Sequence, residues 1–133
     1  MQLDYLKGLR GNGALTYTGP ERLVRISRFS ADEAEGLRRA VQELADGARE
    51  LLWLEDLSFV AGNGYSLVMR TGAEDKGVAT TDERVFCLEL TGGAYGRMLR
   101  AMEPFCSEGS QGSVWLAEAP GGIGLVLSTG GSF

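Results

Sequence analysis

The chain of 133 residues contains no histidine. This absence removes Ser-His-Asp and Cys-His nucleophile pairs, histidine general bases and zinc sites with imidazole ligands. Cysteine is nearly as scarce, because Cys87 and Cys106 are the only two, too few for a disulfide framework or a structural zinc site. We therefore expect no metal, no cofactor and no enzymatic activity, and we interpret both cysteines as small buried hydrophobic residues of a reducing compartment.

Long apolar runs are also missing. The longest candidate, residues 121–128, has the length of a strand and is far too short to span a membrane as a helix. Residues 1–7 have no apolar stretch after a basic one, so we predict no signal peptide and a cytoplasmic location.

Positive charge is in deficit. Lysine and arginine number 13 against 18 aspartates and glutamates, which gives a net charge of −5. Nucleic acids and anionic membranes bind clustered cations, so we expect neither as a partner. An acidic domain instead favours a basic protein partner. The oligomeric state does not follow from these numbers, and a homodimer stays open.

Proline is rare, with 3 residues, whereas the 20 glycines are spread through expected turns. No internal repeat, low-complexity tract or linker is visible in the sequence. The length, with 44% hydrophobic and 23% charged residues, predicts a single domain over residues 1–133. Within it, residues 1–20 are expected to be irregular, with at most a short strand at 14–18.

Two amphipathic helices are predicted from apolar residues spaced three and four apart. For the first helix, Ser30 is a good N-cap and Glu33 occupies the capping-box position. Its apolar stripe consists of Ala34, Leu37, Val41, Leu44 and Ala48. The second helix covers residues 94–103, opens at Thr91 or Gly92 and ends before Pro104. Its stripe consists of Tyr95, Met98, Leu99 and Met102.

Alternating or apolar runs predict strands at 22–29, 57–61, 65–70, 84–90, 114–118 and 123–128. Three arginines in the first run indicate an edge strand. Gly62-Asn63-Gly64 predicts a tight hairpin turn, and the polar stretch 71–83 a mobile hairpin loop. The expected fold is α+β with the order β-α-β-β-β-α-β-β, a mainly antiparallel sheet carrying both helices on one face.

Two features admit a chemical interpretation beside a structural one. Glu89 interrupts an apolar strand and is either a solvated strand end or a carboxyl of raised pKa beside an apolar pocket, with Glu118 as a candidate partner. The turn at residues 91–96 is either an ordinary helix cap or a weak anion site. The anion site would consist of Gly92, Gly93, Gly96 and Arg97. It matches neither the phosphate-binding loop of nucleotide hydrolases nor the dinucleotide-binding spacing.

Candidate partner-binding residues are of two kinds. Trp53 and Trp115 are aromatic anchors for an interface, or else ordinary core residues. Four acidic residues of the expected loop form a docking face for a basic protein, or else a solvated surface. These residues are Glu74, Asp75, Asp82 and Glu83.

The later element order, α-β-β-β-α-β-β, is similar to that of bacterial type III secretion chaperones, which are also small and acidic. The present chain differs by an extra N-terminal strand and by ending after its last strand, without a final helix. Small acidic bacterial immunity proteins, which bind and neutralise a partner protein, match the same size and charge. The favoured function is therefore a non-catalytic protein-binding module of immunity type. The alternatives are a secretion-chaperone-like protein and a small-molecule or anion-binding domain that uses the turn at Gly92–Gly96.

Overall fold

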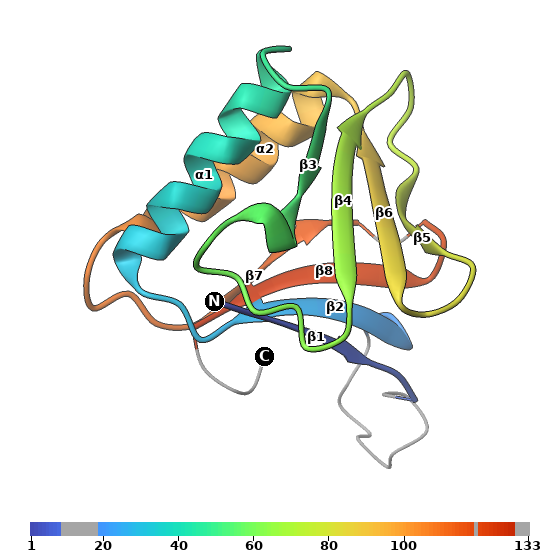
Figure 1. The fold of residues 1–133 in the computed structure, drawn as a ribbon, viewed down its shortest axis with the longest axis horizontal. Coiled ribbons are helices and arrows are strands. Elements are labelled where there is room, and N and C mark those ends of the chain that lie inside the picture. The colour runs from blue at the N-terminus through green and yellow to red at the C-terminus, as the bar shows by residue number, and fades with distance from the viewer. Residues whose placement is uncertain (9–18, 119, 130–133) are drawn as a thin grey trace.

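A computed structural model of the chain describes residues 1–8, 19–118 and 120–129 (Figure 1). Within these residues lie eight strands, two α-helices and two short 3-10 helices, η1 and η2. The strands are β1 (Gln2–Leu6), β2 (Arg22–Ser27), β3 (Leu51–Trp53), β4 (Ser66–Thr71), β5 (Gly77–Thr80), β6 (Val85–Leu90), β7 (Ser113–Ala117) and β8 (Ile123–Ser128). The helices are α1 (Ala31–Ala45), η1 (Leu54–Asp56), α2 (Gly92–Met102) and η2 (Glu103–Cys106).

The strands form two four-stranded sheets, with the orders β1-β2-β8-β7 and β3-β4-β6-β5. In each sheet the central pair is parallel and both outer pairs are antiparallel. The predicted α+β class is confirmed. The predicted single, mainly antiparallel sheet is wrong, because the chain builds two mixed sheets and its described element order is β-β-α-β-β-β-β-α-β-β.

The two halves of the chain repeat one topology that their sequences do not reveal. Each half runs strand, strand, helix, strand, strand, and its two strand pairs join different sheets. The first pair of one half lies beside the second pair of the other half, through the parallel contacts β2–β8 and β4–β6. Each sheet therefore holds strands from both halves, which ties the chain into one folded unit.

The edge strands β3 and β7 each carry a tryptophan. Trp53 on β3 lies opposite Val68 on β4, and Trp115 on β7 lies opposite Val126 on β8. The preceding residues match as well, since Leu52 faces Met69 and Val114 faces Leu127. Trp53 is thus paired with the third residue of β4 and Trp115 with the fourth residue of β8, so the two tryptophans hold similar positions on the edge strands of the two sheets.

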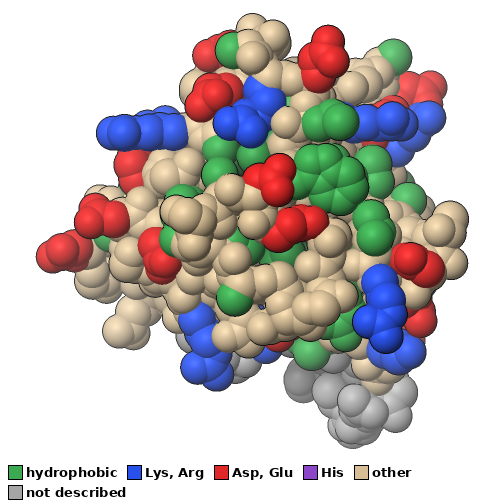
Figure 2. Space-filling model, viewed as in Figure 1, with side chains coloured by type: hydrophobic (Ala, Val, Ile, Leu, Met, Phe, Trp, Pro, Cys, Tyr) green, Lys and Arg blue, Asp and Glu red, His purple; other side chains and the backbone are tan. Residues whose placement is uncertain are grey.

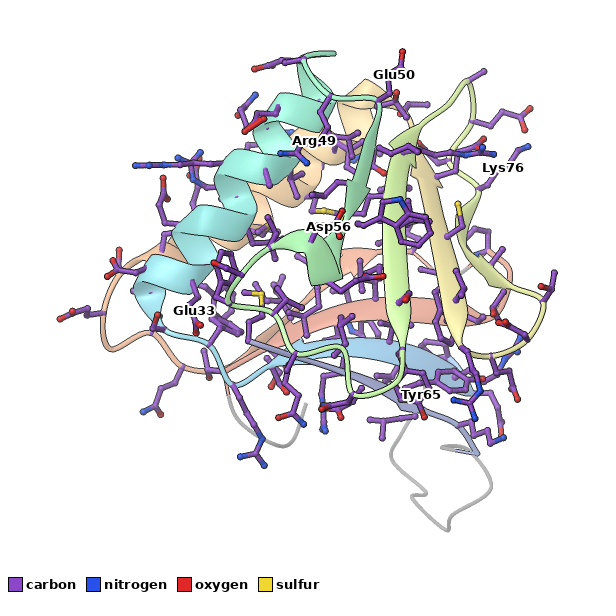
Figure 3. All side chains as sticks on the ribbon, in the orientation of Figure 1. Glu33, Arg49, Glu50, Asp56, Tyr65 and Lys76 are labelled. Carbon is purple, nitrogen blue, oxygen red and sulfur yellow. The ribbon has the colours of Figure 1, made fainter. Side chains whose placement is uncertain are left out.

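Both helices pack together and cover the two sheets from one side (Figure 1). Helix α1 begins with the predicted capping box, in which the Ser30 hydroxyl accepts from the Glu33 amide and the Glu33 carboxylate accepts from the Ser30 amide. Figure 3 shows Glu33 at that end of α1. Helix α2 begins at the predicted cap Thr91, whose hydroxyl accepts from Ala94 N.

The predicted helix stripes are confirmed with one exception. The stripe residues of both helices are buried in one hydrophobic core with the inner faces of both sheets. Ala48 is the exception, because α1 ends at Ala45 and Ala48 is exposed after it. Burial on two sheets offsets the weak helix propensity of the glycines in each helix.

Several strand predictions fail where pairing is long-range. Residues 57–61 are not a strand, although Ala61 makes an isolated bridge with Gln2. The Asn63-Gly64 turn does form, because both residues have positive φ and Tyr65 N donates to Gly62 O at 2.9 Å. It does not join two strands, since the antiparallel partner of β4 is the short β3.

Three further expectations about strand position are corrected. Residues 1–20 are not wholly irregular, because Gln2–Leu6 forms β1. Residues 71–83 are not a single loop, because Gly77–Thr80 forms β5. The arginine-bearing β2 is not an edge strand, since it lies between β1 and β8. The strand expected at 14–18 lies outside the described residues.

Candidate functional site: a cleft beside α2

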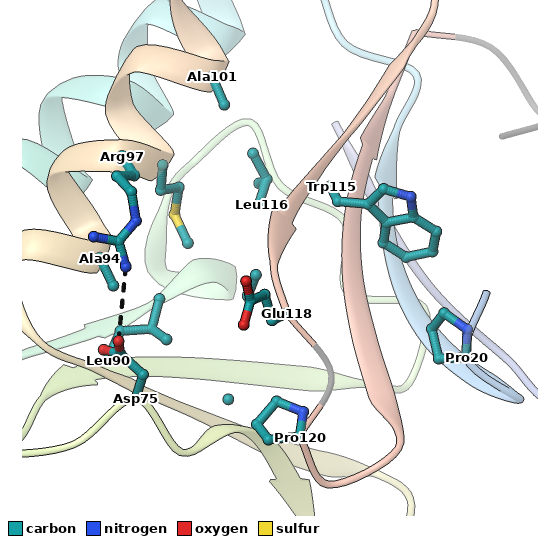
Figure 4. A pocket seen from close by; sticks show the side chains of 13 residues that line it. Pro20, Asp75, Leu90, Ala94, Arg97, Ala101, Trp115, Leu116, Glu118 and Pro120 are labelled. Carbon is teal, nitrogen blue, oxygen red and sulfur yellow. Dashed lines mark ion pairs between the residues drawn. The ribbon is translucent and has the colours of Figure 1, made fainter.

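A cleft of about 490 Å³ opens between α2, the free edge of β7 and the start of β5 (Figure 4). Its walls combine a continuous apolar surface with three charged side chains. The lining residues are Pro20, Asp75, Gly77, Leu90, Ala94, Arg97, Met98, Ala101, Trp115, Leu116, Ala117, Glu118 and Pro120. They come from segments far apart in the sequence, which the fold brings together.

The floor of the cleft is apolar. Leu90, Ala94 and Met98 are buried at the junction of β6 and α2, and Leu116 and Ala117 are buried on β7. Sequence reasoning assigns most of these residues to the ordinary core and does not find the cleft. Periodicity shows that a residue is buried on one face, but it does not show whether the neighbouring element covers that face completely.

Trp115 forms an exposed apolar rim. Its side chain stays 44% exposed although it lies on the β7–β8 pair. The ring is accommodated because the neighbouring β8 residue is Gly124, where a Cβ would stand 2.7 Å from the ring and 2.9 Å from Pro20 Cγ. Figure 4 shows Trp115 and Pro20 together on one side of the β7–β8 ribbon, and Leu116 and Ala101 on the other.

Asp75 and Arg97 form an ion pair across one end of the cleft. The carboxylate lies 3.7 Å from Arg97 Nη2 and accepts hydrogen bonds from both the amide and the hydroxyl of Thr91, each at 2.8 Å. These bonds, chiefly the one from the Thr91 amide, hold the pKa of Asp75 below its ordinary value. Asp75 therefore stays anionic and anchors the segment before β5 to the start of α2.

Glu118 contributes a carboxylate without an internal partner. It is exposed at the end of β7 and makes no hydrogen bond or ion pair with any described residue. Figure 4 shows its side chain on the side of β7 that faces Arg97 and Leu116. A cationic group of a ligand in the cleft would find this carboxylate available.

The predicted anion site at the start of α2 is not supported by these contacts. Asp75 accepts from the amide and hydroxyl of Thr91 and pairs with Arg97, so a protein carboxylate already neutralises the cation of the predicted site. Gly92 and Gly93 are exposed and Gly96 is half-buried. The turn acts as a helix cap, which was the structural alternative.

Glu89 is not a carboxyl of raised pKa. It is 8% exposed on β6, and Arg70 Nε donates to it at 2.9 Å while Lys76 Nζ lies at 3.6 Å. The Arg70 guanidinium in particular lowers the pKa of Glu89. The interpretation of Glu89 as a solvated strand end is also wrong, because its side chain is packed over Gly72. Glu118 lines the cleft and Glu89 does not, so the two carboxylates are not brought together there.

The acidic residues predicted to share one docking face are separated by β5. Asp82 accepts from the amides of Arg84 and Val85, and Glu83 accepts from Tyr5 Oη at 2.8 Å. Asp82 and Glu83 line a smaller hollow of about 260 Å³, which lies at the other end of β5 from the cleft. Glu74 lies before β5 and is exposed. Figure 2 shows acidic side chains spread over the face in view, without a single acidic patch.

Of the six predicted partner-binding residues, the structure thus brings Asp75 and Trp115 to the cleft, together with Arg97. Trp53 is half-buried on the other sheet and does not line the cleft. On that sheet Leu51 and Val85 are exposed.

Neither a membrane helix nor a metal cluster is found in the part of the chain that the structure describes. No helix there is long and apolar enough to cross a bilayer, and no three or more acidic or cysteine side chains converge as metal ligands. Comparison of the chain with protein-family models, with curated proteins and with solved structures finds no match.

Proposed function

We propose that the chain is a non-catalytic protein-binding module whose cleft beside α2 receives an apolar side chain of a partner protein. The observation that carries this proposal is an open apolar cleft beside an exposed tryptophan and a charged rim. Interface anchors are characteristically aromatic, and they bind in apolar pockets surrounded by polar residues.

The chemistry of the cleft favours binding over catalysis. The Asp75 carboxylate already accepts from Thr91 and pairs with Arg97. Apart from Asp75 and Arg97, no other acidic or basic side chain lines the cleft beside Glu118. No serine, threonine, cysteine or lysine lines the cleft, so a side-chain nucleophile beside a general base is missing from its described lining.

The net charge of −5 supports a basic partner. The sequence favours one specific form of this proposal, an immunity role in which the partner is a toxin. The likeness to secretion chaperones carries less support, because four strands separate the two helices where the expected order had three.

A small apolar molecule is the second candidate ligand. The volume of about 490 Å³ is typical of small-molecule sites, which are mostly apolar with a few polar groups. This candidate replaces the anion-binding alternative, since the apolar floor offers an anion no donor other than Arg97.

The test compares three proteins in affinity capture from the source cell. Ala101→Trp fills the cleft from α2, whereas Leu51→Arg changes an exposed residue on β3 that does not line the cleft and serves as the matched control. We expect a protein that is captured by the native chain and by Leu51→Arg but lost with Ala101→Trp, and that changes Trp115 fluorescence on binding. Equal capture by all three proteins contradicts the proposal.

A further inference from the structure

The two halves of the chain differ in the lengths of several connections, among them the one between their last two strands. In the first half, β3 is joined to β4 by residues 54–65, whereas in the second half β7 is joined to β8 by residues 118–122. The longer connection contains η1 and a turn that folds back between α1 and β1. Ala61 N donates to Met1 O at 2.8 Å, and Leu3 N donates to Ala61 O at 3.0 Å.

Phe59 is the side chain that this longer connection inserts against α1. Its ring lies so close to Gly36 that a Cβ at that position would stand 3.0 Å from two ring carbons. Phe59 also packs against the hydrophobic core, with Leu57 and Val60 beside it. The molecule thus shows how one apolar segment covers the inner side of a helix beside an edge strand.

The cleft occupies the equivalent place beside α2. Counted from the N-caps Ser30 and Thr91, Gly36 matches Arg97 and Ala40 matches Ala101. Burial supports this alignment of the two helices, because Leu37 and Met98 each lie seven residues after the N-cap and both are buried.

A similar leucine follows the tryptophan of each edge strand. Leu54 follows Trp53 and Leu116 follows Trp115, and both leucines are buried. Arg97, Met98, Ala101 and Leu116 all line the cleft. The cleft therefore lies beside α2 much as Phe59 lies beside α1, and the β7–β8 connection, residues 118–122, contains no aromatic residue in its sequence.

The charged rim distinguishes this space from its filled counterpart. Arg97 replaces Gly36, but its side chain is 66% exposed and turned toward Asp75, so it leaves the floor open. Glu118 is the carboxylate without an internal partner. A ligand that carries a cation next to its apolar anchor complements both the floor and this carboxylate.

We propose that the cleft binds a peptide segment of a partner protein that presents an aromatic side chain with a lysine or arginine a few residues away. The aromatic ring lies on Ala94, Met98 and Leu116, as Phe59 lies on α1, and the cation pairs with Glu118. This inference rests on the proposed function, because it specifies the ligand of the same cleft.

The probe is a synthetic peptide, acetyl-Lys-Leu-Ser-Phe-Val-Ala-Lys-amide, which copies residues 57–61 of the chain around Phe59 and adds a lysine at each end. Binding is followed by NMR through the indole N–H of Trp115 and the amides of α2. We expect replacement of the peptide's phenylalanine by alanine to weaken binding by about tenfold or more, since burial of the ring is lost. Replacement of both lysines by glutamate is expected to weaken binding about fivefold at low salt.

Two protein variants complete the test. Ala101→Trp is expected to abolish peptide binding, and Leu51→Arg to leave it unchanged. Glu118→Lys alters only an exposed side chain, so it keeps the fold even if the tryptophan variant does not, and it is expected to reverse the preference between the lysine and glutamate peptides.

Three results would overturn the proposal: the alanine peptide binds as tightly as the phenylalanine peptide, Glu118→Lys leaves the charge preference unchanged, or free indole binds as tightly as the peptide. Loss of a captured partner with Ala101→Trp would in those cases still support a protein-binding cleft. Capture that is insensitive to Ala101→Trp would instead contradict the proposed function itself.

Discussion

The ring of Phe59 lies on the bare backbone of Gly36, which leaves room for it on the inner side of α1. The equivalent helical position in α2 carries Arg97, and the space beside it is open. The same topology therefore produces a filled site in one half of the chain and an open cleft in the other.

Replacement of Gly36 by arginine should displace Phe59 from α1. We expect the free energy of unfolding to fall by about 1–2 kcal/mol, because the lost burial of the ring exceeds the gain in helix propensity. Urea denaturation followed by circular dichroism measures the change. The matched variant Arg97→Gly should cost about 1 kcal/mol, mainly from helix propensity, because the exposed ion pair with Asp75 contributes little. A Gly36→Arg protein as stable as the native chain would show that packing of the Phe59 ring against α1 does not stabilise the fold.

Leu44 tests the core beneath α1. It is fully buried in the main hydrophobic cluster, so Leu44→Ala removes apolar contacts and leaves a cavity. We expect a loss of roughly 2–5 kcal/mol in the free energy of unfolding, measured in urea. Leu51→Ala, at an exposed position on β3, should change it by less than about 0.5 kcal/mol. Similar losses from the two variants would contradict the assigned helix face.

The Arg70–Glu89 pair predicts a pH dependence of stability. The pKa of Glu89 is lowered in the folded protein, so its contribution is present above the pKa of the unfolded chain. That contribution is lost as pH falls through the lower, folded pKa. Glu89→Gln should therefore lower Tm at pH 7 and have progressively less effect as the pH is lowered below about 4.

Thermal unfolding of the native chain, Glu89→Gln and Arg70→Met between pH 7 and pH 2 checks this prediction. Arg70→Met should remove part of the same pH dependence, because Arg70 is the main cause of the lowered pKa. If Glu89→Gln follows the native curve at every pH, the pair contributes nothing to stability.

Asp82 should matter for folding more than Glu74 does. The Asp82 carboxylate accepts from the amides of Arg84 and Val85 and thereby closes the turn between β5 and β6. Asp82→Ala is expected to lower Tm, whereas Glu74→Lys, at an exposed position, should change stability by less than about 0.5 kcal/mol. Differential scanning calorimetry of both variants distinguishes a structural turn from a surface loop, for which the two changes would have equal effects.

Local signals in the sequence determined the helices and several turns. The capping box of Ser30 and Glu33, the cap at Thr91 and the apolar stripes act within one or two turns of helix, so the sequence specifies them directly. The turn at Asn63 and Gly64 formed for the same reason, because both residues tolerate positive φ. The absence of histidine limited the available chemistry without reference to any structure.

The tertiary structure alone decided the pairing of the strands. The contacts β2–β8 and β4–β6 join strands distant in the sequence or separated by another strand, and β3 is too short to show a period. No local pattern states which strand lies beside which. Long-range packing therefore also decided that β2 is internal and that Gln2–Leu6 and Gly77–Thr80 are strands.

The candidate site follows the same division. Sequence reasoning found Trp115, Asp75 and Arg97 separately, as residue types suited to binding, but it assigned them to different features. These three residues come together only in the folded chain, where the short β7–β8 connection leaves the cleft beside α2 open. The cleft is formed by residues of several distant segments, so no local pattern in the sequence marks it. The sequence thus determined which side chains were available, and the packing of the two halves decided which of them line one cleft.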